Sequence, residues 1–106
     1  MDEISEFAIN YLLSGSGTAR SLPLAFAQRA PDQSALQVIY VLSIAASGIE
    51  SLFDSAEMKA LATEVWRMAA LVGVDLHMMQ SHQPPSSNCA GLIHYWQTVD
   101  GFFLSP

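Results

Sequence analysis

Three histidines and five methionines occur in this 106-residue chain, and several of them gather in one short stretch. His77, Met78, Met79 and His82 follow closely on one another, and His94 comes shortly after. Imidazole and thioether groups suit copper and related transition metals. The five-residue step from His77 to His82 argues against a metal, because ligands on one helix face lie three or four residues apart. These five residues form our secondary hypothesis, a site for an apolar ligand or a metal.

The single cysteine has little support as a nucleophile, and the favoured alternative is that it packs as a small apolar residue. Cys89 is expected near the start of the last helix, where the helix dipole lowers a thiol pKa. His94 lies five positions later and would not face Cys89 along a regular helix. The sequence lacks a G-x-S-x-G turn and a phosphate-binding glycine loop with lysine, and it has no convincing pair of catalytic carboxylates. We therefore predict no catalytic residues and no cofactor, and we favour a non-enzymatic protein. An enzyme whose active site is assembled from residues with no local signature is the third alternative.

Aromatic residues are the better candidates for a functional surface. Tryptophan and tyrosine recur at interface hot spots because each buries a large area and keeps one polar group. The alternative is that both tryptophans simply pack in the core. The candidate interface residues are Trp66, Phe102, Phe103, Tyr95 and Trp96.

Charge and composition narrow the possible partners. The chain has ten acidic and four basic residues, a net charge of −6, and its bases are scattered. Nucleic-acid binding needs several bases on one face, and docking on anionic lipid has the same requirement, so we predict neither nucleic-acid nor membrane binding. Apolar residues make up 51% of the chain and charged residues 13%. So few charges predict an exposed apolar patch of the kind that binds partners.

The compartment follows from three further features. One cysteine cannot form an internal disulfide. The opening sequence MDEISEF is acidic, unlike a secretory signal. The most apolar window, Ala35–Ala46, is shorter than the roughly twenty residues that a membrane span needs. We expect a cytoplasmic protein.

Apolar side chains recur at steps of three and four, which predicts a single all-α domain over residues 1–106. We expect a compact bundle of four to five helices, mostly antiparallel, because the connections are short. The expected helices cover residues 2–14, 18 or 21 to 28, 32–53, 54 to about 79, and 88–99, with a polar loop at 81–88.

Several local signals set the expected helix ends. Asp32 is a good N-cap residue for the third helix, and Asp54 with Glu57 has the spacing of a capping box for the fourth. Gly73 is expected to bend or divide the fourth helix, and Asp75 would help to cap the second piece.

Two apolar segments have more than one possible cover. Residues Leu36–Ala46 are apolar nearly all the way round, so this helix is either the hub of the bundle or covered by another subunit. The tail Phe102–Leu104 must dock on its own domain or on a partner. These features predict a non-enzymatic interaction or regulatory module that associates with itself as a homodimer, or with another protein.

Overall fold

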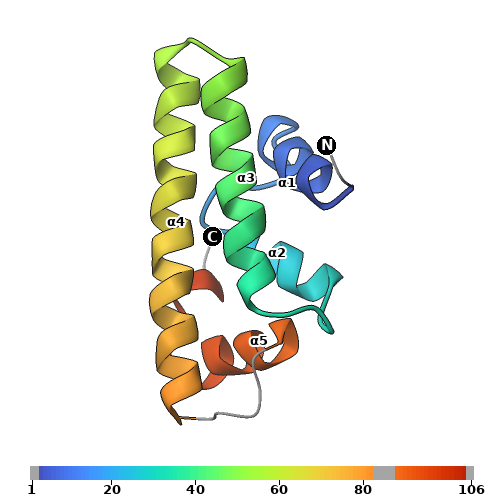
Figure 1. Ribbon diagram of the computed structural model, residues 1–106, viewed down its shortest axis with the longest axis vertical. Helices are drawn as coiled ribbons and strands as arrows, with labels where there is room; N and C mark the ends of the chain where they lie inside the picture. Colours follow the sequence, from blue (N-terminus) through green and yellow to red (C-terminus); the bar gives the residue numbers. More distant parts are fainter. Residues whose placement is uncertain (1–2, 83–87, 105–106) are drawn as a thin grey trace.

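Five α-helices make up the computed structural model, which describes residues 3–82 and 88–104 (Figure 1). Within these ranges there is no β-strand, only an isolated bridge between Ser34 and Asn88. The predicted all-α bundle is therefore confirmed. The elements are α1 (Glu3–Leu13), α2 (Leu22–Arg29), α3 (Leu36–Leu52), α4 (Ala56–His82), α5 (Cys89–Thr98) and a final 3₁₀ turn, η1 (Phe102–Leu104).

The hairpin of α3 and α4 forms the most extensive helix–helix contact of the molecule. With 27 residues, α4 is about 40 Å long and nearly matches the longest dimension of 42 Å. The two helices lie side by side, and α1 and α2 flank α3 away from α4 (Figure 1). α3 packs against α4, α1 and α2, with most of its contacts to α4, which agrees with the first of the two alternatives that its apolar sequence left open.

One apolar core joins all the helices. Along α4 the buried residues follow steps of three and four, which is the helical period expected from the sequence. The largest fully buried side chains are Trp96, Phe26, Phe103, Leu22, Leu42, Ile49, Met79 and Leu92.

The start of α3 differs from the prediction. The helix begins at Leu36, and Asp32 does not cap it. The backbone before it is used instead to hold the start of α5. The Cys89 N–H donates to the Gln33 carbonyl at 2.8 Å, and the Ala90 N–H donates to the Pro31 carbonyl at 3.0 Å. Residues 31–33 therefore form a turn and not the first turn of α3. Their carbonyls satisfy N–H groups at the start of α5.

The start and course of α4 also correct the prediction. The Met58 N–H donates to Ser55 Oγ at 3.1 Å, so the cap is Ser55 and the predicted box of Asp54 with Glu57 was wrong. The helix continues through Gly73 without a break, and Asp75 is buried and caps nothing. Of the predicted loop at 81–88, the first two residues belong to α4, and residues 83–87 lie outside the described residues.

The apolar C-terminal tail docks on its own chain. Phe103 is buried beside Trp96, with ring centroids 5.0 Å apart. Arg20 holds the adjacent residue, because its Nε donates to the Phe102 carbonyl at 2.9 Å and its guanidinium lies 3.9 Å from the Phe102 ring centroid. No helix in the described ranges is long and apolar enough to cross a membrane.

Candidate functional site

The described members of the histidine and methionine cluster differ in exposure. His77 is exposed, whereas Met79 is buried in the core and Met78, its neighbour, is 40% exposed. His94 is exposed on α5, and the side chain of His82 lies outside the described residues. Among the residues that the structure describes, no three His, Cys, Asp or Glu side chains are placed to hold a metal ion.

Cys89 lies at the first position of α5, as predicted, but its surroundings do not activate it. The side chain is fully buried, and Sγ donates to the Ser34 carbonyl at 3.6 Å. Burial raises the pKa of the Cys89 thiol to about 11, because an apolar environment disfavours the thiolate. With a pKa of about 11, the thiol is neutral near pH 7 and is a poor nucleophile.

Cys89 is expected to react with an alkylating reagent far more slowly in the native protein than in urea. The pKa of Cys89 rises from 9.0 in the unfolded chain to about 11 in the fold. Below pH 9.0 the thiol is neutral in both states, so its contribution to the free energy of unfolding is fully present. As the pH rises toward 11 the unfolded chain loses this proton first, and the free energy of unfolding falls. Alkylation followed by mass spectrometry measures both rates. Equal rates in buffer and in urea would show that Cys89 is accessible in the fold.

A buried polar pair, which the sequence did not reveal, links α4 to α5. Asp75 is only 6% exposed, and its Oδ2 accepts a hydrogen bond from Trp96 Nε1 at 2.9 Å. Burial raises the pKa of the Asp75 carboxyl, the hydrogen bond from Trp96 lowers it, and the nearby charge of Asp100 raises it. Asp75 follows the apolar period of α4, and that position was the signal for a buried partner.

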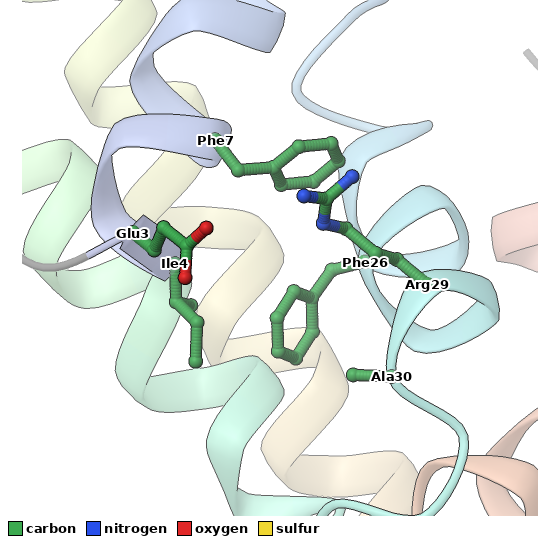
Figure 2. Close-up of a pocket in the computed structure, with 6 residues that line it drawn as sticks. All are labelled: Glu3, Ile4, Phe7, Phe26, Arg29 and Ala30. Carbon is green, nitrogen blue, oxygen red and sulfur yellow. The ribbon is translucent and has the colours of Figure 1, made fainter.

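Pockets occur between α1 and α2 and beside α4. Between α1 and α2, a cavity of about 120 Å³ is lined by Glu3, Ile4, Phe7, Phe26, Arg29 and Ala30 (Figure 2). The Arg29 guanidinium covers the Phe7 ring at 4.8 Å from its centroid. An adjoining depression of about 320 Å³ shares Glu3, Phe7 and Arg29. The charged residues that line these two pockets are Glu3, Glu6 and Arg29. The other pocket, beside α4, contains Asp75 and is considered below.

The predicted interface aromatics fall into three groups. Trp66 is 39% exposed on α4, and its Nε1 donates to Glu50 Oε1 of α3 at 2.7 Å. Tyr95 and Phe102 are half-buried. Trp96 and Phe103 are core residues with 1% of their surface exposed, so they offer no contact area to a partner. Trp66 is thus the aromatic residue of this set that is best placed on the surface.

The largest group of exposed apolar side chains lies on the α3–α4 hairpin. On α3 an exposed or half-exposed stripe follows steps of four and three, and on α4 Trp66 starts a second stripe with steps of four. Leu36 is 61% exposed, Tyr40 45% and Val74 58%. We call these two stripes together the hairpin face. It comprises Leu36, Tyr40, Ser43, Ser47 and Glu50 of α3 with Trp66, Ala70, Val74 and Met78 of α4.

Comparison with protein-family models, with curated proteins and with solved structures finds no match to this chain.

Proposed function

We propose that this protein is a non-enzymatic interaction module that associates with a second copy of itself through the hairpin face. The supporting observation is the group of large apolar side chains on that face, which includes Leu36, Tyr40 and Trp66. Exposed apolar patches on small proteins are characteristic of contact surfaces. The buried core of α3 is complete without them, so their apolar character does not serve the fold.

The low charge of the hairpin face is compatible with a second copy as the partner. The whole chain carries a charge of −6, so two copies repel unless the contact surface is neutral. From Leu36 to Ile49 α3 has no charged residue. Glu50 is the single charge on the hairpin face, and its carboxylate accepts the Trp66 N–H. Because a two-fold interface places the same patch on both subunits, a neutral patch is self-compatible.

The spacing on α3 also suits helix-on-helix contact. Leu36, Tyr40, Ser43 and Ser47 alternate steps of four and three, which is the period at which one helix face meets another. The two serines are small and permit close approach, whereas Leu36 and Tyr40 supply apolar area. Such a dimer would function in the cytoplasm, where a lone reduced cysteine is normal.

The test of this proposal is the association of Trp66→Ala beside a matched control, Leu13→Ala. Leu13 is 42% exposed on α1, similar to Trp66, but it lies off the hairpin face. We expect Trp66→Ala to weaken dimerisation at least about tenfold, because buried tryptophans dominate interface energies and the dimer contains two. Sedimentation velocity over a dilution series measures this. Equal behaviour of the two variants would refute the assigned surface.

A further inference from the structure

The pocket beside α4 is built by the turn that follows α5. It has a volume of about 170 Å³ and is lined by Leu71, Asp75, Asp100, Phe102 and Phe103. Asp100 Oδ1 accepts the Phe102 N–H at 3.1 Å and so stabilises the turn between α5 and η1. The Phe102 and Phe103 rings meet edge to face, with centroids 5.1 Å apart. The walls are therefore fixed by contacts within the chain.

Negative charge in this pocket lacks a cationic partner. Asp75 is only 6% exposed. It has no ion-pair partner among the described residues, where the single ion pair joins Arg67 to Glu64. Trp96 Nε1 engages Oδ2 of Asp75, and a carboxylate has capacity for further donors. Burial is the main cause that raises the pKa of the nearby Tyr95 hydroxyl. The negative charges of Asp75 and then Asp100 raise it further, because both lie close to that hydroxyl.

The lining combines carboxylates with apolar side chains, which together suit an organic cation that carries a hydrocarbon chain. Asp75 and Asp100 attract the charge, and the Phe102 and Phe103 rings supply apolar area. Arg20 already covers one face of Phe102, with its guanidinium 3.9 Å from the ring centroid, so the ring contributes apolar surface and not a cation site. Leu71 supplies an apolar wall for a hydrocarbon chain. A metal ion fits less well, because no suitable set of three ligands exists among the described residues.

We propose that this pocket binds a small alkylammonium ion, with its charged head at the Asp75 carboxylate and its hydrocarbon part against Phe102, Phe103 and Leu71. A cavity of about 150 Å³ holds a benzene molecule, so the volume here suits a ligand of that size. The site is separate from the hairpin face and does not depend on association.

The two tryptophans provide the readout for a test with butylammonium chloride. The Trp96 indole N–H bonds to Asp75, so its NMR signal is expected to shift and saturate on titration, while the Trp66 signal stays in place. Sodium chloride at the same ionic strength and neutral butanol are the controls. Butanol should bind at least about tenfold more weakly, because it lacks the charge that pairs with Asp75.

Asp75→Asn is the decisive variant, since it keeps the shape and an oxygen that accepts the Trp96 N–H. We expect it to weaken butylammonium binding at least about tenfold, whereas Asp54→Asn, the same charge change at an exposed position, has no effect. Asp100→Asn gives a second test if Asp75→Asn does not fold, and it should weaken binding too. Equal binding of butanol, movement of both indole signals alike, or unchanged binding by a folded carboxylate variant would overturn the proposal.

Discussion

Trp96→Ala is expected to lower the free energy of unfolding by about 3–5 kcal/mol, the usual cost of deleting a buried tryptophan side chain. The side chain is 1% exposed, contacts Phe103 and donates to Asp75. Its loss leaves a cavity and an unpaired buried carboxylate. Small domains are stable by about 5–15 kcal/mol, so this single change removes a large share of the stability. Urea denaturation followed by circular dichroism measures it.

Trp66→Ala is the matched control for that experiment when all variants are measured at a chain concentration at which the unmodified protein is monomeric, because a lost dimer contact would otherwise also lower the free energy of unfolding. Trp66 also donates to a carboxylate, that of Glu50, but it is 39% exposed and the pair is at the surface. Exposed pairs contribute little, so the control should cost about 1 kcal/mol or less. Trp96→Phe keeps an aromatic ring and removes the N–H donor, and it should cost about 1–3 kcal/mol. Equal losses in the free energy of unfolding for Trp96→Ala and Trp66→Ala would show that the contact between α4 and α5 does not make the large contribution to stability expected here.

Tyr40→Asp is expected to weaken self-association by about a thousandfold. Tyr40 is 45% exposed in the middle of the hairpin face, on a helix with no charge from Leu36 to Ile49. An interface tyrosine contributes about 2 kcal/mol, and a two-fold dimer loses it twice. The resulting change of about 4 kcal/mol corresponds to about three powers of ten in the dissociation constant. The added carboxylates also repel each other across the interface.

Asn10→Asp separates this local effect from the general repulsion between acidic chains. It adds the same single negative charge to the chain, but on an exposed position of α1 away from the hairpin face. Net charge acts at long range and is screened by salt, so this variant should dimerise nearly as well as the original chain. Both variants change exposed side chains, and far-UV circular dichroism should show unchanged helix content.

Helix content and the core could be predicted from the sequence, because the apolar period of α4 continues from Ala62 to Met79 and is visible within that segment alone. The start of α3 could not be predicted. The Pro31 carbonyl accepts the N–H of residue 90, and the Gln33 carbonyl accepts the N–H of residue 89. These partners are far along the chain, so no local pattern contains the contacts. Asp32 therefore looked like a cap by the local rule and was not one.

The burial of Asp75 was predictable from its position on α4. Gly73 suggested a break in α4, and the carboxylate was then assigned to a new helix start. Its place on the apolar stripe, between Val72 and Met79, was the stronger signal, because a carboxylate there needs a buried donor. Trp96, which can only donate, was a suitable partner, but no spacing rule joins residues 21 positions apart.

The exposed side of α3 was the least predictable feature. Its middle is apolar all round, so the sequence does not say which flank α1, α2 and α4 leave open. That choice depends on how three other helices pack, and it left Leu36 and Tyr40 at the surface. Trp66, by contrast, lay at the border of the α4 stripe and was a surface candidate from its position alone.

Sedimentation equilibrium of the unmodified chain beside Tyr40→Asp tests the central claim most directly. The association proposed for the hairpin face predicts twice the 11.5 kDa chain mass for the unmodified protein and a single chain mass for the variant at the same concentration. A single chain mass for both proteins, or a dimer that Tyr40→Asp leaves intact, would contradict it.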